Sequence, residues 1–419
     1  MSFPRYPKYK DSGVEWLGEV PEHWGVCAFK HCMRMRYGDA LAAEMRQDGD
    51  IEVYGSNGAV GTHCVANTKS PAIVVGRKGS FGKVVWAELG GFVIDTAYII
   101  DADTTAQNLH WVFYTLHPMG LDSISQDTGV PGLAREKAYE IQLAVPPPVE
   151  QTHIAAFLDR ETAKIDDLVG EQRRLIELLK EKRQAVISHA VTKGLNSHAP
   201  MKPSGIEWFG DVPAHWEVGP LKRYWSVTDC KHVTAEFVED GIPLASIREV
   251  QSRWVALENA KRTTEYFYEL LIEGGRRPSP GDLIFSRNAT VGEVAQVSVD
   301  HPSFAMGQDV VLLRKLSPEY SSDYLQHVIR SPIIIQQLAN MMIGSTFKRI
   351  NVEEIRSFVL PSPPPSEQAE ISAYLEDEVT KLDALTAEAQ RAIDLLQERR
   401  TALISAAVTG QIDVRQFTQ

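Results

Sequence analysis

The chain has 419 residues, a formal net charge of −12, and 43% hydrophobic and 23% charged residues. These values are typical of a soluble globular protein with several domains, and no apolar run reaches the roughly 18–20 residues that cross a bilayer. The first residues lack the apolar stretch of a secretion signal and the four cysteines form no CxxC pair, so the sequence favours a reduced, cytoplasmic protein. An acidic balance is unusual for a protein that binds nucleic acid alone.

The first motif in the chain is a peptide with two tryptophans that occurs twice. "SGVEWLGEVPEHW" occupies residues 12–24 and "SGIEWFGDVPAHW" occupies residues 204–216, with nine of thirteen positions identical. This similarity indicates an internal duplication. His23 and His215 take the same place in the two copies, which favours a packing role for both over catalysis.

The segments that follow the two peptides differ in sequence and length but share a faint pattern. In the first segment, "VYGSNGAVG" carries an Asn-Gly hairpin signal. "IVVGRKGSFGKVV" (73–85) then aligns with "LIFSRNATVGEVA" (283–295), and both predict a strand, a glycine-rich turn and a strand. The alignment pairs Arg77 with Arg287, Ser80 with Thr290, Gly82 with Gly292 and, further on, Asp95 with Asp309. We therefore expect two related α+β domains that have diverged.

Two long helices are predicted, one after each of these segments. Residues 150–194 and 367–410 align without a gap at an offset of 217 through Thr192 and Thr409. Both segments follow proline clusters, contain no internal proline and are rich in helix-forming residues. Each ends at a glycine, and at about 1.5 Å per residue each is roughly 65 Å long.

Apolar residues recur four and three positions apart in both helices, which predicts a coiled-coil seam. The predicted seam residues are Ile154, Leu158, Ile165, Leu168, Leu175, Leu179 and Val186, and then Ile371, Leu375, Leu382, Leu385, Ala392, Leu396 and Leu403. A repeated seam on a repeated helix favours antiparallel packing of the two about a pseudo-two-fold axis. The alternative is two core helices in separate bundles.

No catalytic motif stands out in the chain. It lacks a phosphate loop, a nucleophile elbow, an HExxH motif and the Asn-Pro-Pro-Tyr type of motif that amino-methyltransferases use. Cys27, His31 and Cys32 could approach a zinc ion, but no second ligand pair has a standard spacing, so no metal is expected. The sequence predicts a chain that is not an enzyme by itself.

Two loops have the composition of nucleic-acid contacts. "GRKGSFGK" (76–83) places basic residues beside small ones, and "GSTFKRIN" (344–351) precedes the second helix as "QDTGVPGLAREK" (126–137) precedes the first. With the hairpin and one further arginine, the candidate DNA contacts are Asn57, Arg77, Lys78, Ser80, Lys83, Arg135, Arg248, Arg287, Asn288, Thr290, Ser345, Thr346, Lys348 and Arg349. Ordinary solvated turns would have a similar composition.

Together these motifs resemble the specificity subunit of type I restriction–modification systems. The resemblance rests on the doubled tryptophan peptide, on "PPPVEQTHI" and "PPPSEQAEI" before the helices, on "YGSNG" and "GRKGS", and on the closing "ALISAAVTGQID". It covers nearly the whole chain. It implies two target-recognition domains, at residues 1–149 and 196–366, two long antiparallel spacer helices, at 150–195 and 367–412, and a tail at 413–419.

The resemblance also implies partners. Each domain would read half of a bipartite, asymmetric double-stranded DNA site, and the helices would dock two methyltransferase subunits. Those subunits would use S-adenosylmethionine, and restriction subunits that use ATP and Mg²⁺ could join them, so this chain would hold no cofactor. A coiled-coil DNA-binding repressor or adaptor without methyltransferase partners is the alternative.

Overall fold

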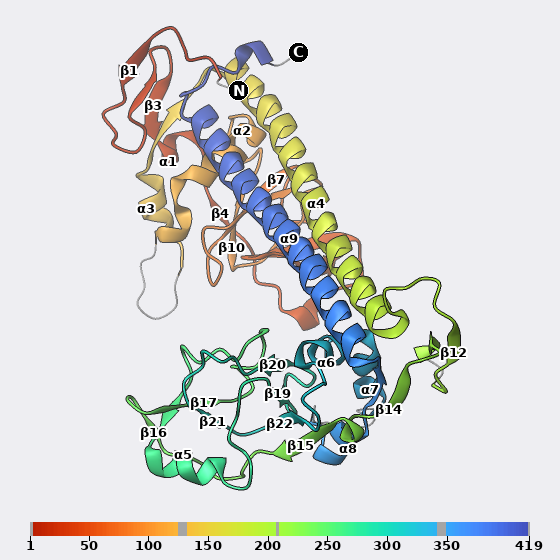
Figure 1. Cartoon of the computed structure of the whole chain (residues 1–419). Helices are drawn as coiled ribbons and strands as arrows, with labels where there is room; N and C mark the ends of the chain where they lie inside the picture. The colour runs from red at the N-terminus through yellow and green to blue at the C-terminus, as the bar shows by residue number, and fades with distance from the viewer. Residues whose placement is uncertain (1–2, 125–131, 207–208, 342–348, 418–419) are drawn as a thin grey trace. The chain divides into compact units, whose positions relative to one another are not determined.

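The structure is a computed structural model that describes residues 3–124, 132–206, 209–341 and 349–417 (Figure 1). The chain folds as two compact units. The first unit joins residues 1–174 with 389–419, and the second comprises residues 175–388. Each unit therefore takes half of each long helix, whereas the sequence motifs placed domain boundaries at the helix ends. Among the described residues, no helix has both the length and the apolar character of a membrane span.

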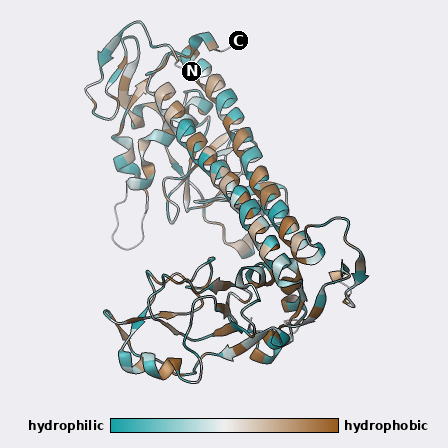
Figure 2. Cartoon of the chain, viewed as in Figure 1, coloured by the Kyte–Doolittle hydropathy of each residue, from teal (hydrophilic) through white to brown (hydrophobic). Residues whose placement is uncertain are grey.

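The two long helices are α4 (Pro148–Lys193) and α9 (Pro365–Val408). Each begins two residues before the predicted start, at a proline that needs no amide partner in the first turn. Each is followed by a glycine in the left-handed region, Gly194 at φ 72° and Gly410 at φ 75°, which ends the helix. Figure 2 shows hydrophobic residues recurring among hydrophilic ones along both helices.

The helices pair antiparallel in both units, as the sequence predicted. In the first unit Arg400 lies 3.3 Å from Asp166, and in the second Arg183 lies 3.2 Å from Asp383. Each residue of one pair stands 217 positions from its counterpart in the other, so the two ion pairs are equivalent under the sequence repeat. The predicted antiparallel pairing of the repeated helices is thus present in each unit.

The predicted seam needs a correction of one position in the middle of the helices. Leu168, Leu175 and Leu385 are 45%, 42% and 53% exposed, so the prediction was wrong for these three residues. The neighbours Val169 and Ile176 are buried instead. The seam residues that are buried are Ile154, Leu158, Ile165, Val169, Ile176, Leu179 and Ile187 in α4, and Ile371, Leu375, Leu382, Ala389, Ile393, Leu403 and Ile404 in α9.

The first unit contains four small sheets. Their strands, in sheet order, are β1 (Tyr9–Asp11) and β2 (Glu19–Pro21); β4 (Arg36–Tyr37), β10 (Ala97–Ile100), β7 (Ala72–Gly76) and β8 (Val84–Ala87); β6 (Gly58–His63), β5 (Ile51–Gly55) and β9 (Phe92–Val93); and β3 (Gly25–Ala28) with β11 (Gln142–Val145). The short helices are α1 (Phe29–Cys32), α2 (Leu109–Leu116) and α3 (Arg135–Tyr139). The predicted Asn-Gly hairpin joins β5 to β6.

The second unit repeats this topology with one additional edge strand in its third sheet. Its strands are β12 (Met201–Pro203) and β13 (Asp211–Pro213); β15 (Trp225–Asp229), β22 (Val310–Lys315), β19 (Leu283–Ser286) and β20 (Val294–Gln296); β16 (Phe237–Val238), β18 (Arg262–Thr263), β17 (Ile242–Ala245) and β21 (Ala305–Met306); and β14 (Glu217–Pro220) with β23 (Val359–Ser362). The helices are α5 (Glu265–Ile272), α6 (Ser322–Ile329), α7 (Pro332–Met341) and α8 (Val352–Ser357).

Matching details show that the two units are diverged copies of one α+β design. The β5 strand pairs antiparallel with β6 and parallel with β9, and β17 pairs in the same way with β18 and β21. The side-chain oxygen of Gln151 accepts the amide of Asn108 at the start of α2, and Gln368 does the same for Ser321 at the start of α6. Both glutamines lie on the long helices, which therefore fix the equivalent short helix in each unit.

Candidate nucleic-acid interface

The tryptophan peptide joins the ends of the two long helices in each unit. In the first unit, the Trp24 indole N–H donates to Glu150 Oε2 at 2.9 Å, and His23 Nε2 lies 2.6 Å from Glu150 Oε1. In the second unit, Trp216 and His215 contact Glu367 Oε2 at 2.9 and 2.8 Å. Trp24 and Trp216 are fully buried, so the carboxylate at the start of each helix provides an acceptor that water cannot replace.

The same tryptophans lie against the end of the opposite helix. A Cβ atom on Gly410 would lie 3.0 Å from the Trp24 ring, and one on Gly194 would lie 3.1 Å from the Trp216 ring. Each peptide thus holds the start of one helix beside the end of the other. The histidines serve this junction, as their repeated position predicted.

In the first unit, the hairpin and the glycine-rich turn meet. Lys83 Nζ donates to the backbone oxygen and to Oδ1 of Asn57, both at 2.9 Å. A Cβ atom on Gly76 would lie 2.2 Å from the Ser80 carbonyl oxygen and 2.7 Å from that of Ser56, so only glycine fits between the two turns. Asn57, Ser80 and Lys83 are all exposed. Three candidate DNA contacts therefore share one exposed surface.

Two further candidate DNA contacts pack against the ring of the same tyrosine. The guanidinium carbons of Arg77 and Arg135 are 4.8 and 4.6 Å from the ring centroid of Tyr37, which is 42% exposed. Arg77 also donates to the Asp95 carbonyl oxygen, and Arg135 to that of Met35. Cation–π contacts and carbonyl bonds hold both guanidinium groups, and Arg135 Nη2 also lies 3.1 Å from Glu136 Oε1.

The phenol of Tyr98, which lies beside Tyr37 and the two arginines, keeps its proton. Burial, followed by the neighbouring Tyr37, raises the pKa of Tyr98 to about 12, although Arg77 and Arg135 act in the opposite direction. Tyr98 is therefore neutral at physiological pH and donates its proton to the Leu133 carbonyl oxygen. The positive charge of the two arginines is not offset by a phenolate.

In the second unit, Arg287 is placed differently from its aligned partner Arg77. Arg287 is 5% exposed and its Nη1 lies 3.2 Å from Asp229 Oδ2, whereas Arg77 is partly exposed. Burial and this ion pair leave the Arg287 side chain little surface for a ligand. No sequence motif pairs these two residues, because Asp229 is far from Arg287 in the chain and comes from the strand β15.

Two neighbouring candidate DNA contacts, Asn288 and Arg349, both contact the carboxylate of Asp309. Asn288 Nδ2 donates to Asp309 Oδ2 at 3.2 Å, and Arg349 Nη2 lies 3.3 Å from Asp309 Oδ1. Arg349 is 51% exposed at its side chain and forms a backbone bridge with Asn288. Thr290 bonds the Ser286 hydroxyl instead. Ser345, Thr346 and Lys348 lie outside the described residues.

The two turns are equivalent in their backbone hydrogen bonds. Gly76 N–H donates to the Lys83 carbonyl and Ser286 N–H to that of Glu293, both at 2.8 Å. Leu133 N–H donates to the Arg77 carbonyl and Ile350 N–H to that of Arg287, at 2.8 and 2.9 Å. These matches support the alignment of the two segments and show that the stretch before each long helix returns to the same turn.

One aligned pair is wrong by a single position. Arg77 N–H donates to the Thr96 carbonyl, whereas Arg287 N–H donates to that of Asp309. Strand pairing agrees, because Ala97 faces Gly76 and Val310 faces Ser286. Thr96, and not Asp95, is thus the counterpart of Asp309. The first unit therefore lacks a carboxylate at the position that organises the second.

Two of the three residues considered for a zinc ion lie close together. Cys27 Sγ lies 3.0 Å from Cys32 Sγ, and His31 is exposed on α1. Burial, followed by the hydrogen bond with Cys27, raises the pKa of Cys32 to about 12, so this thiol is protonated at physiological pH. Asp229, Cys230 and His232 lie close enough to share an ion, but Asp229 already pairs with Arg287.

Comparison with known proteins gives consistent results. The family model described as the type I restriction modification DNA specificity domain matches residues 262–394. The chain is 23% identical over 317 residues to the type I restriction enzyme MjaVIII specificity subunit of Methanocaldococcus jannaschii, covering 73% of this chain and 70% of that one. It is 21% identical over 356 residues to the EcoBI specificity subunit of Escherichia coli, covering 81% and 73%.

Solved structures share the fold. A chain from a study of complex assembly and conformational transition of the type I R-M system aligns with a TM-score of 0.61 at 15% identity, covering 93% of this chain and 98% of that one. The HsdS subunit from Thermoanaerobacter tengcongensis aligns with a TM-score of 0.52 at 13% identity, covering 96% and 100%.

Proposed function

Because the chain belongs to the specificity subunits of type I restriction–modification systems, we propose that it reads a bipartite, asymmetric DNA site, with one half read by each unit. The observation that supports this most directly is that equivalent turns in the two units have the same backbone hydrogen bonds but different side chains. The turns at Arg77 and Arg287 have the same hydrogen bonds, but one presents the partly exposed Arg77 and the other a carboxylate, Asp309, that contacts Arg349. Equivalent positions with different chemistry suit two different half-sites.

We assign the first half-site to the Arg77 and Arg135 cluster with Asn57 and Lys83, and the second to Arg349 with Asn288. Lysine and arginine contacts position the protein on phosphates, while bidentate arginine or asparagine contacts distinguish bases. Arg287 supports its turn from within, because it is buried on Asp229.

Paired substitutions test this assignment. Arg77→Ala is expected to weaken or relax recognition of one half-site only, and Arg349→Ala of the other, each by about 1–3 kcal/mol if a base is contacted. Binding to a panel of half-site variants gives the measurement, with Arg34→Ala and Lys222→Ala as exposed controls in the two units. If either variant changes both half-sites equally, the assignment of one half-site to each unit is wrong.

The outer surface of the long helices suits two copies of one partner. Leu168 and Leu385 are repeat equivalents and are 45% and 53% exposed; Leu178 and Leu395 are also equivalents and are 52% and 65% exposed. Each unit carries one leucine from each pair, Leu168 with Leu395 and Leu178 with Leu385. Exposed leucines that recur with the repeat indicate a repeated contact surface.

We assign this surface to two methyltransferase subunits. They would supply S-adenosylmethionine, and any restriction subunits would supply ATP and Mg²⁺, so that this chain contributes recognition and no turnover of its own. Methylation would take place in the cytoplasm, where these partners meet DNA.

Native mass spectrometry tests the stoichiometry. Leu395→Glu and Leu178→Glu should each remove one methyltransferase subunit, and the double variant both, while Val299→Glu, at a residue that is 79% exposed elsewhere, should remove none. Retention of two subunits by the double variant would show that the leucines are not the contact. Methyl transfer by the purified chain alone would contradict the assignment of catalysis to the partners.

A further inference from the structure

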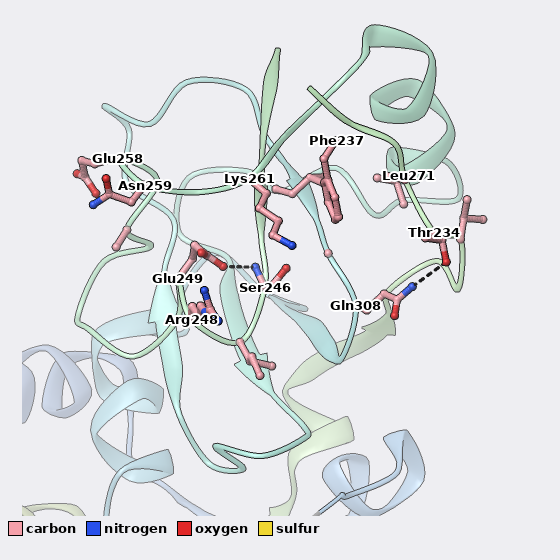
Figure 3. Close-up of a pocket in the computed structure, with 16 residues that line it drawn as sticks. Thr234, Phe237, Ser246, Arg248, Glu249, Glu258, Asn259, Lys261, Leu271 and Gln308 are labelled. Atoms are coloured by element: carbon pink, nitrogen blue, oxygen red, sulfur yellow. Dashed lines mark hydrogen bonds between the residues drawn. The ribbon is translucent and has the colours of Figure 1, made fainter. Parts of the chain in front are cut away.

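A pocket of about 680 Å³ lies in the second unit (Figure 3). Its walls combine apolar side chains, such as Phe237 and Leu271, with the side chains of Lys261, Arg248 and Gln308. A volume of this size, apolar walls and a few polar groups are typical of sites for small ligands. Figure 3 shows Lys261 near the centre, with Phe237 above it and Gln308 on the opposite wall from Asn259.

The pocket is built from a stretch that is much shorter in the first unit. There, β5 ends at Gly55 and β6 begins at Gly58, so only a tight turn joins them. In the second unit, β17 ends at Ala245 and the paired strand β18 begins at Arg262. The long connection between them supplies half of the lining residues, and α5 supplies Leu271. The pocket is therefore formed by a connection that is present in the second unit and absent at the equivalent place in the first unit.

The pocket adjoins the Asp309 cluster along the chain. Gln308, which precedes Asp309, lines the pocket, and its Nε2 lies 3.4 Å from the hydroxyl of Thr234 on the same side of the pocket. Asp309 in turn holds Asn288 and Arg349. Arg248, a candidate DNA contact from the sequence, lies in the pocket wall as well. A ligand in the pocket would thus lie next to residues assigned to the second half-site.

The wall carries two cations, Lys261 and Arg248, and two carboxylates, and the cations together with Phe237 suit an aromatic ligand that carries an anion. Lys261 Nζ lies 4.2 Å from the Phe237 ring centroid, and Phe237 is 54% exposed. Of the two carboxylates in the wall, Glu249 accepts the Ser246 amide at 2.8 Å, which fixes the turn after β17. Glu258 lies beside Asn259 at the opposite side of the pocket from Thr234 and Gln308 (Figure 3). Lys261 and Arg248 can then serve a phosphate, while the amide groups match the edge of a base.

We propose that this pocket binds a single unpaired nucleotide, with the base against Phe237 and Leu271, the base edge at Gln308 and the phosphate at Lys261. The nucleotide comes either from the DNA site, as a base taken out of the stack, or from free nucleotide in solution. The proposal extends the DNA-reading function of the second unit. Extruded bases in other proteins are held in the same way, between aromatic or apolar side chains with hydrogen bonds to the base edge.

The first experiment detects a base from DNA. The full chain, with methyltransferase subunits, is bound to DNA that carries 2-aminopurine in turn at each position of the second half-site and its flanks, excluding the methylated adenine. Fluorescence should rise at one position for the natural protein. Phe237→Ala and Lys261→Gln should abolish this rise and weaken binding roughly tenfold, the order expected for one stacked base. Lys222→Gln, which removes an exposed charge outside the pocket, should do neither.

The second experiment detects free nucleotide. Equilibrium dialysis with each of the four deoxynucleoside monophosphates should show binding that Phe237→Ala and Lys261→Gln remove, if free nucleotide is the source. Absence of both the fluorescence rise and nucleotide binding, with specific DNA binding intact, would overturn the pocket proposal and leave the proposed function standing. Loss of specific DNA binding by the natural protein itself would instead overturn the proposed function. Circular dichroism of the variants excludes unfolding as the cause.

Discussion

At the scale of single residues, Glu150 and Glu367 show how much can depend on one carboxylate. Each accepts an indole N–H from a fully buried tryptophan and contacts the preceding histidine. A carboxylate in the first turn also interacts favourably with the positive end of the helix dipole. The repeated peptide and the repeated glutamate are therefore one structural device, present once in each unit.

Removing one carboxylate should destabilise its own unit. Glu367→Ala leaves the Trp216 indole N–H buried without its acceptor, and we expect a loss of about 2 kcal/mol in the free energy of unfolding. Glu370→Ala, an exposed position on the same helix, should cost less than about 0.5 kcal/mol. Urea unfolding of the two variants gives the comparison, and equal losses would show that the acceptor is replaceable.

His327 on α6 gives the second unit a dependence on pH. Burial, followed by Arg253, Arg330 and Arg183, lowers its pKa to about 4, with Glu376 acting in the opposite direction. In the unfolded chain a histidine titrates near 6.5, so the unfolded state takes up the proton first. Stability is therefore complete above about pH 6.5 and falls as the pH drops toward 4.

The expected loss from this residue at pH 5 is on the order of 1–2 kcal/mol relative to pH 7. His327→Gln keeps a polar side chain but removes the titration. Urea midpoints at pH 7 and pH 5 should therefore differ less for the variant than for the natural protein. An unchanged difference would mean that other groups set the acid sensitivity of the second unit.

At the scale of elements, the long helices show what periodicity can and cannot predict. Their extent, their pairing and the ends of the seam followed from composition and spacing. In the middle, adjacent apolar residues such as Leu168 and Val169 satisfy a four-and-three pattern equally well, and only packing decides which one is buried. The larger leucine is left outside.

The burial of Val169 in place of Leu168 has a measurable effect on stability. Val169 is 7% exposed and Leu168 is 45% exposed, so Val169→Ala should lower the free energy of unfolding by about 1–2 kcal/mol, while Leu168→Ala should change it by less than about 0.5 kcal/mol. Thermal unfolding of the two variants decides between the registers. A larger effect at Leu168 would restore the seam inferred from spacing alone.

The candidate site was predictable in its backbone and less so in its side chains. The glycine-rich turns, the hairpin and the relation between the two segments followed from turn chemistry. The burial of Arg287 on Asp229 and the position of Tyr37 between two arginines depend on strands that are distant in the chain. A single sequence contains no signal that pairs such residues. The alignment of Asp95 with Asp309 was wrong because Thr96, and not Asp95, takes the equivalent position, and it does so through backbone hydrogen bonds alone.

At the scale of the whole molecule, the repeat predicts what half of the chain would do. A fragment of residues 1–194 keeps the first peptide, the first recognition domain and all of α4. The second half of α4 is the repeat equivalent of the part of α9 that completes the first unit. We therefore expect two fragments to pair, each completing the other, and to direct methylation to a palindrome built from the first half-site.

The pairing of fragments should be weaker than the pairing in the intact chain, for a reason that the structure supplies. In the first unit, Phe417 packs 6.1 Å from Phe157 and Arg415 lies 3.9 Å from Glu150, and residues 1–194 lack this closing segment. Adding residues 411–419 after Gly194 should restore these contacts and tighten the dimer. Sedimentation of the two fragments gives the comparison, and a stable monomer would contradict pairing through the repeat.

The segments that precede β1 and follow α9 also meet each other. The Asp413 amide donates to the Pro4 carbonyl at 2.8 Å, and Phe3 lies 5.6 Å from Phe417. In the second unit, one continuous stretch, residues 194–201, makes the equivalent passage from the end of α4 to β12. In the first unit two separate segments therefore meet where the second unit has one continuous segment. A circular permutant, in which a short linker joins the two ends of the chain and a new opening is made near Asn196, should retain both half-sites with their order along the chain exchanged.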